Sequence, residues 1–382
     1  MHHTRIFKMN FIDTFGREEF FQNYWEKKPL VIRNALEPEF FNISEDELWE
    51  MAQDDYFETR LIQESKKKKT VTHGPLQIKK ENLTGPYTLF IHNLNLYNNS
   101  ALALEHAVEA FPKYLFDDVM CSLSTMDSTV GAHIDPYNVF IVQAKGIREW
   151  SLQLEPDPTY KDDQDIKELK NFSSDQMFML NPGDVLYIPP QVAHQGVTIE
   201  DSISLSIGFN SFESKDLIQN FLNSCLAEDY ETDSHILLNS PADFSQDPYK
   251  VSEEVMADLK SPIMHLLQEE TIENWILCYL TTPKKEIFPP ESPLEFDDFI
   301  KETKQMKLCF DEFVRMSARE VEQKMIVAIN GELSYLNQKQ YEIFRELYKQ
   351  KHQTFEYKPG VLDEFIFELY LKGCLFFVED ED

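Results

Sequence analysis

Short apolar runs separated by turn residues fill the chain from residue 119 to residue 212. Each run is five to eight residues long, and Gly, Pro, Asp or Asn separates it from the next. Closely spaced short strands of this kind are typical of a β-sandwich or a small barrel. No helical pattern interrupts them, so a doubly wound parallel sheet is not expected. The runs are VMCSLST, YNVFIVQ, REWSLQL, QMFML, DVLYIPP and SISLSIGF.

The segment before this β-rich region mixes helical and extended patterns. Residues 17–28 carry aromatic side chains at helical spacing, and Pro29 ends that pattern. The sequence LVIRN then predicts a short strand, and residues 55–100 alternate like strands joined by loops. The basic run at 65–69 predicts a solvated turn.

The pattern becomes helical after Ser214. Helices are expected on both sides of an irregular polar stretch at 232–250, and a proline-containing linker at 281–293 follows. The remainder predicts a helix, a hairpin with Asn330-Gly331 at its turn, and two more helices, an order that resembles a winged helix. We therefore expect a mixed α+β chain with domains at 1–212, 213–285 and 286–382, the second of them helical.

Composition narrows the protein class. A chain of 382 residues with 42% hydrophobic content supports two or three compact units. No stretch nears the roughly 18 apolar residues of a membrane span, and the first residues lack the pattern of a secretory signal. The five cysteines are far apart, which fits reduced thiols. We therefore expect a cytoplasmic protein without a membrane span.

The net charge of −31 is the strongest bulk property of the chain. Phosphate binding needs a basic face, so direct contact with nucleic acid is not expected. An acidic surface favours association with a basic partner. The alternative is that the acidity serves only solubility, and charge alone does not separate the two.

The phrase GAHIDPYNVFIVQ contains the first candidate metal ligands. His133 and Asp135 are two residues apart, and side chains alternate along a strand, so both are expected on one face. This spacing alone is no better than chance, because 67 of the 382 residues are acidic.

A second histidine gives the pair its context. His194 lies in GDVLYIPPQVAHQG, in which a turn precedes the strand VLYI and two prolines end it. Two histidines and one carboxylate form a facial triad that leaves open positions on Fe(II), with zinc as the rival metal. The alternative is that either histidine is an ordinary polar residue at a barrel rim.

Arg148 is the candidate co-substrate ligand. Alternation along the next strand places Arg148 on one face with Trp150 and Leu152, which indicates that the guanidinium points inward. A buried guanidinium needs an anion, and a carboxylate of 2-oxoglutarate suits its planar fork. The alternative is an ion pair with a protein carboxylate. Serine rows could complete the pocket or be the wet side of their strands; they are Ser122 and Ser124, and Ser202, Ser204 and Ser206.

Together these segments resemble the bacterial ribosomal oxygenases, a JmjC subfamily. The matching segments lie within residues 10–212 and are YWEKKPLVIRNA, ETRLI, THGP, DDVMCSLST, GAHIDPYNVFIVQAKGIREW, PGDVLYIPPQVAHQG and SISLSIGF. Asn138 stands where many relatives carry Asp. The resemblance implies a double-stranded β-helix of the JmjC/cupin jelly-roll type. It also implies a helical domain that forms a homodimer, for which an apolar stripe in residues 263–279 is the candidate surface.

The resemblance further implies a function and its residues. Iron would be bound by His133, Asp135 and His194. The co-substrate 2-oxoglutarate would contact Arg148 and Ser124, with Ser204 or Ser206 nearby, and O2 would be the second co-substrate. Substrate contacts would fall on Asp118, Met120 and Tyr137, and the substrate would be an arginine of a basic large-subunit ribosomal protein of the L16 type.

Two rival functions stay open at this point. One is the same oxygenase chemistry on a histidine or another protein side chain. The other is a catalytically silent cupin that serves as a binding module.

Overall fold

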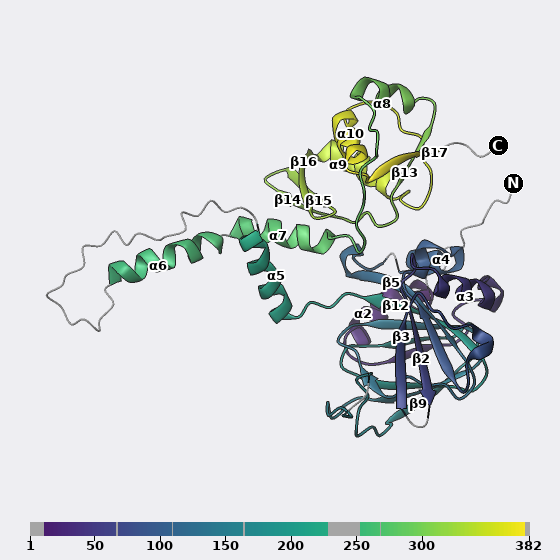
Figure 1. Ribbon diagram of the computed structural model, residues 1–382. Helices are drawn as coiled ribbons and strands as arrows, with labels where there is room; N and C mark the ends of the chain where they lie inside the picture. The colour runs from purple at the N-terminus through teal and green to yellow at the C-terminus, as the bar shows by residue number, and fades with distance from the viewer. Residues whose placement is uncertain are drawn as a thin grey trace. The chain divides into compact units, whose positions relative to one another are not determined.

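The computed structural model describes residues 11–65, 68–108, 110–162, 165–227, 253–267 and 269–378 (Figure 1). The predicted polar stretch at 232–250 and two residues of the predicted basic turn, 66 and 67, lie outside the described residues. The chain divides into two compact units, Met1–Ser211 and Phe212–Asp382.

Two antiparallel sheets form the first unit. The larger sheet has the strand order β1-β10-β7-β12-β5-β4-β2-β3, and the smaller has β6-β11-β8-β9. Apolar side chains from both sheets share one buried cluster that includes Ile141, Trp150 and Leu186, so the sheets pack face to face. This is the expected jelly roll. The strands are β1 (Leu30–Ile32), β2 (Thr59–Ser65), β3 (Lys68–His73), β4 (Tyr87–Ile91), β5 (Phe116–Ser124), β6 (His133–Ile134), β7 (Val139–Lys145), β8 (Arg148–Gln153), β9 (Gln176–Leu180), β10 (Val185–Ile188), β11 (Ala193–Thr198) and β12 (Ser202–Phe209).

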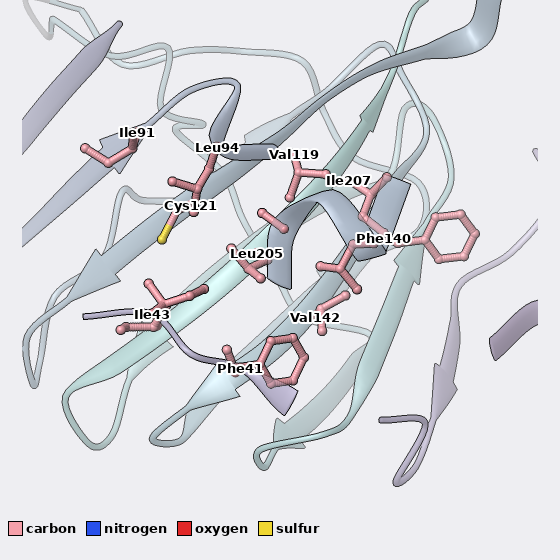
Figure 2. Close-up of a cluster of buried hydrophobic side chains, with 14 of the residues drawn as sticks. Phe41, Ile43, Ile91, Leu94, Val119, Cys121, Phe140, Val142, Leu205 and Ile207 are labelled. Atoms are coloured by element: carbon pink, nitrogen blue, oxygen red, sulfur yellow. The ribbon is translucent and has the colours of Figure 1, made fainter. Parts of the chain in front are cut away.

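The two faces of the larger sheet differ in chemistry. In β12, Ile203, Leu205 and Ile207 enter a large apolar core, while the serines between them take the opposite face. Figure 2 shows part of this core, with side chains from β4, β5, β7 and β12 beside Phe41, Ile43 and Leu94. The apolar face therefore stabilises the unit and leaves the serine face for the space between the sheets.

Helices pack on the apolar face of the larger sheet, and one of them is shorter than predicted. They are α1 (Phe11–Phe15), α2 (Arg17–Asn23), α3 (Glu45–Gln53) and α4 (Asn99–Ala107). The helix predicted over 17–28 ends at Asn23, because Tyr24 leaves the helical region and Glu26 has a φ of 56°. Phe20 is nevertheless fully buried, and its ring lies 5.1 Å from that of Tyr187. The aromatic face of this helix is therefore packed in the core although the helix is shorter than predicted.

The second unit contains helices and two small sheets. The expected hairpin is present: β15 and β16 pair around Asn330 and Gly331, whose φ angles are 50° and 85°, as a tight two-residue turn requires. The predicted helix, hairpin and two later helices are present in that order, together with three strands that were not predicted. Within the described residues no helix is both long and apolar enough to span a membrane. The elements are α5 (Ser214–Ala227), α6 (Glu253–Leu266), α7 (Glu269–Thr281), α8 (Phe296–Glu302), β13 (Lys307–Phe310), β14 (Met316–Val321), β15 (Lys324–Ile329), β16 (Glu332–Asn337), α9 (Gln338–Tyr348), α10 (Asp363–Leu371) and β17 (Leu375–Val378).

Candidate metal centre and co-substrate pocket

Three predicted ligands come together where β6 pairs with β11. His133 lies directly opposite His194 in this ladder, and their ring centroids are 4.2 Å apart. The Asp135 carboxylate lies 3.9 Å from Nε2 of His133 and 3.5 Å from Nε2 of His194. One ligand atom from each residue lies within 4.8 Å of the other two. The arrangement can hold one metal ion.

The prediction that His133 and Asp135 lie in the same strand is wrong. Strand β6 ends at Ile134, so Asp135 follows the strand and does not alternate with His133 along it. The backbone carbonyl of Asp135 accepts from the amide of Gln191, 2.9 Å away. That contact ties the turn after β6 to the turn before β11. His194 likewise lies in a strand of its own, which sequence reasoning missed.

Both imidazoles are held in the same way. Nδ1 of His133 lies 3.0 Å from the carbonyl oxygen of Gly131, and Nδ1 of His194 lies 3.1 Å from that of Val192. A carbonyl can only accept, so each Nδ1 is the protonated nitrogen and each Nε2 keeps its lone pair. The two lone pairs and the carboxylate are the donors that a divalent metal needs.

Burial keeps His194 neutral. The residue is 3% exposed, and burial, followed by the nearby His133 ring, lowers the pKa of His194 to about 4. A neutral imidazole is the metal-binding form. Two imidazoles and one carboxylate suit Fe(II), which takes this set with open positions for further ligands. The donor chemistry therefore fits the implied iron.

Arg148 is a buried cation without a carboxylate partner. It is 4% exposed, its ring-stacking partner is Trp150 at 4.9 Å, and its Nη1 lies 3.4 Å from the Ser122 hydroxyl. Its Nε has no hydrogen-bond partner, and among the described residues none forms an ion pair with it. Burial alone lowers the pKa of Arg148 to about 10, still far above neutrality. The alternative of a protein ion pair is therefore not what the structure contains, and the pocket suits an incoming anion.

A chain of buried hydroxyls lies beside this cation. Ser124 donates to Thr88 at 3.1 Å, Thr88 donates to Ser128 at 3.4 Å, and Ser128 donates to Thr198 at 3.2 Å. Thr198 pairs with Arg148 in the β8–β11 ladder. Sequence reasoning named only Ser124 of these four, because a lone threonine or serine in an apolar run carries no pattern.

The remaining predicted serines differ from one another. Ser204 is buried and its hydroxyl donates to the Gln143 side chain at 2.8 Å. Ser206 is half-buried and pairs with Met120 across β5 and β12. Ser202 is buried and its hydroxyl has no partner. It is therefore a better candidate for a co-substrate contact than its position in the serine row suggested.

The three predicted substrate contacts lie on the serine face or near the metal ligands. Asp118 and Met120 alternate with Val119 in β5, and Asp118 is 7% exposed. The amide of Asn93 donates to the Asp118 carboxylate at 3.0 Å, and His92 lies 3.6 Å from it. Burial, with the carboxylates of Asp135 and Asp118, raises the pKa of Tyr137 above its usual range. Tyr137 therefore lies within the field of both acids.

Asn138 has a role of its own in the fold. Its side-chain oxygen accepts from the Tyr187 hydroxyl at 2.5 Å, and that hydroxyl in turn accepts from the Glu26 amide. The Asn138 side chain thus contacts the aromatic core through Tyr187.

The chain is similar in sequence to known proteins. Residues 103–217 match the family model described as a JmjC domain. The chain is 28% identical over 304 residues to the ribosomal protein uL16 3-hydroxylase of Escherichia coli (strain K12), covering 76% of this chain and 79% of that protein. It is 32% identical over 198 residues to a probable ribosomal oxygenase of Haemophilus influenzae, covering 50% of this chain and 48% of that one.

Solved structures extend the likeness to the whole architecture. The E. coli ribosomal oxygenase YcfD in complex with cobalt and 2-oxoglutarate has a TM-score of 0.74 to this chain at 25% identity, covering 95% of this chain and 98% of that one. A second structure of E. coli YcfD has a TM-score of 0.76 at 24% identity and covers 94% and 98%. Residues 103–217 accordingly resemble a JmjC domain, and the chain is similar along nearly its whole length to the structures of the E. coli ribosomal oxygenase YcfD.

Proposed function

We propose that this chain is an Fe(II)- and 2-oxoglutarate-dependent dioxygenase that hydroxylates an arginine of a large-subunit ribosomal protein. The observation that carries the proposal is the pairing of two features in one β-helix. A His-Asp-His cluster can hold a metal, and a buried arginine without a counter-ion can bind an acid beside it.

Each side chain has a distinct task in this proposal. His133, Asp135 and His194 would hold Fe(II), which with 2-oxoglutarate and O2 supplies oxidative decarboxylation and hydroxylation of a C–H bond. Arg148 would bind the distal carboxylate of 2-oxoglutarate, with Ser124 nearby. The surrounding apolar cluster of both sheets would exclude water from that ion pair and so strengthen it.

The substrate assignment rests on chemistry and on the relatives. Asp118, Met120 and Tyr137 would bind the side chain, since a guanidinium pairs with a carboxylate and stacks on an aromatic ring. The net charge of −31 favours a basic protein as partner. One relative is described as a uL16 3-hydroxylase, which supports a substrate of that type. A histidine or another side chain is the alternative substrate.

Three further properties belong to the proposal. We expect a cytoplasmic protein that does not bind nucleic acid directly, because its charge repels phosphate. We also expect a homodimer formed through the helical part of the second unit. Its described helices leave large apolar side chains exposed, which is unusual for a free surface; they are Ile218, Leu222, Met256, Leu259, Ile263 and Met264, and the exposed Leu267 directly follows α6. Light scattering on wild type and Ile263→Asp tests this: a dimer that becomes a monomer is expected.

The oxygenase chemistry is tested by anaerobic addition of Fe(II) and 2-oxoglutarate to the purified chain. A visible charge-transfer band and uncoupled succinate formation on admission of air are expected. Asp135→Ala should abolish both, while Asp162→Ala, which removes an exposed acid that pairs with Lys170, should keep both. Absence of the band in wild type would support a silent binding module instead.

The substrate is tested in cells that lack the gene. Mass spectrometry of ribosomal proteins should show the loss of one +16 Da modification on an arginine of the uL16-type protein, restored by wild type and not by Asp135→Ala. An unchanged mass for that protein would remove the ribosomal assignment while leaving the oxygenase chemistry intact.

A further inference from the structure

A buried ion pair lies against the segment that leads into the metal site. Lys69 of β3 and Glu168 are joined at 2.9 Å, and their side chains are 8% and 12% exposed. The two residues are 99 positions apart in the chain. Glu168 also binds Lys161 at 2.6 Å, but that lysine is 40% exposed. The pair therefore links the β2–β3 hairpin to the loop that contains Glu168.

The ion pair rests on the backbone of Gly131. A Cβ atom at this position would lie 2.5 Å from Cδ of Glu168 and 2.7 Å from Nζ of Lys69. Gly131 also has a φ of 90°, which side chains rarely adopt. Only glycine lets the charged groups lie this close to the main chain, so the position of Gly131 and that of the ion pair are coupled.

The loop that contains Glu168 also contacts Ala132, the residue that follows Gly131. The amide of Leu169 donates to the carbonyl of Ala132 at 2.8 Å. Ala132, Leu169 and Ala193 form a small apolar cluster, and Ala193 immediately precedes His194. A short bridge between Tyr160 and Leu169 closes the loop on itself. The loop that contains Glu168 thus contacts the chain at Ala132, just before His133, and at Ala193, just before His194.

Gly131 carries the contact that aims one of these histidines. Its carbonyl accepts from Nδ1 of His133 at 3.0 Å and so fixes the ring with Nε2 towards Asp135. Groups that orient a metal ligand in this way influence metal affinity strongly. A shift of Gly131 would turn the His133 ring and move its lone pair.

We propose that the Lys69–Glu168 ion pair is a positioning device for His133, acting through the Gly131 backbone. The inference rests on the proposed metal site. Lys69 and Glu168 are positioning residues here, since neither lies among the three metal-cluster residues.

The test is cobalt binding by the full-length, metal-free protein, followed by anaerobic visible spectroscopy. Lys69→Met and Glu168→Gln should each weaken Co(II) affinity about tenfold or more and alter the ligand-field bands of the bound ion. Lys69→Arg, which keeps the charge, should restore most of the affinity. Lys161→Met removes the exposed arm of the same network and should leave affinity and bands unchanged.

Thermal unfolding of the same metal-free variants separates this role from a purely structural one. Lys69→Met is expected to lower the melting temperature as well, so affinity is measured well below it. Unchanged Co(II) affinity and bands in Lys69→Met and Glu168→Gln, even with a lower melting temperature, would overturn the inference alone. A wild-type protein that binds no Co(II) would instead refute the proposed function, and the inference with it.

Discussion

Among the described residues of the first unit, the lysine and arginine that are buried, Lys69 and Arg148, differ in their surroundings. Taken as whole residues, Lys69 is 6% exposed and Arg148 is 4% exposed. Lys69 has the carboxylate of Glu168 at 2.9 Å, whereas Arg148 has a hydroxyl at 3.4 Å, an indole face and one nitrogen without a partner. Burying a charge is costly unless it is paired. A paired cation can therefore serve the fold, but an unpaired one implies a partner that comes from outside the chain.

The comparison predicts opposite effects of removing each charge, and the largest concerns Arg148. Arg148→Leu should weaken 2-oxoglutarate binding to the cobalt-loaded protein about a hundredfold or more, because loss of one partner of a buried charge pair costs roughly 2–5 kcal/mol. The ligand-free variant should unfold in urea with a free energy equal to or above that of wild type, since an uncompensated charge has left the interior. Calorimetry and urea unfolding measure the two quantities.

A fall in unfolding free energy of more than about 1 kcal/mol in ligand-free Arg148→Leu would contradict this account. It would mean that the guanidinium stabilises the fold by itself. The matched variant is Lys69→Met, a change of the other buried cation to an apolar residue.

The second prediction is the loss of stability in Lys69→Met. This change leaves Glu168 with only its exposed partner Lys161, so the free energy of urea unfolding should fall by about 3–5 kcal/mol. The 2-oxoglutarate affinity of the cobalt-saturated protein should change far less than in Arg148→Leu. If Lys69→Met unfolds like wild type, the ion pair contributes no net stability, and the contrast between the two cations disappears.

The features that the sequence predicted correctly are those that depend on neighbouring residues alone. Alternation along residues 148–152 was enough to place Arg148 inside, and the structure buries it. The serine alternation in residues 202–207 and the Asn330-Gly331 turn are equally local, and both are present. Each depends only on a period of two or on the backbone freedom of a single turn.

The partners of these groups were out of reach of the sequence, because they come from distant segments. Nothing near Lys69 in the chain points to Glu168, and the hydroxyl chain from Thr88 to Thr198 crosses three separate parts of the sequence. The strand that carries His194 was hidden for the same reason, since pairing in register with His133 fixes it. Spacing indicated the three metal ligands only as candidates, and the family resemblance implied that they bind iron.

The third prediction sharpens the Arg148 side of the comparison by crowding the cation without removing it. A Cβ on Gly196 would lie 2.9 Å from Nη2 of Arg148 and 3.0 Å from the Trp150 ring. Gly196→Ala should therefore push the guanidinium aside and weaken 2-oxoglutarate binding about tenfold, with overpacking that costs roughly 1–3 kcal/mol of stability. Gly360→Ala, whose new methyl group would meet nothing closer than 3.9 Å, is the control. Equal 2-oxoglutarate affinity in the two variants would show that a methyl group at position 196 does not displace the Arg148 guanidinium.

The smallest expected effect is a pH dependence on the Lys69 side. Burial raises the pKa of Glu168, but hydrogen bonds from Lys161 and Lys69 outweigh it and hold the pKa below its ordinary value of 4.5. A depressed carboxyl pKa stabilises the fold above the ordinary value, and that stabilisation is lost as the pH falls through the folded-state pKa. Wild type should therefore lose its advantage in unfolding free energy over Glu168→Gln as the pH drops below about 4.5. Other acids titrate in both proteins and cancel in the difference. A gap that stays constant or widens towards acid pH would show that the carboxylate charge of Glu168 is not what holds the loop, and that its shape alone packs against Gly131.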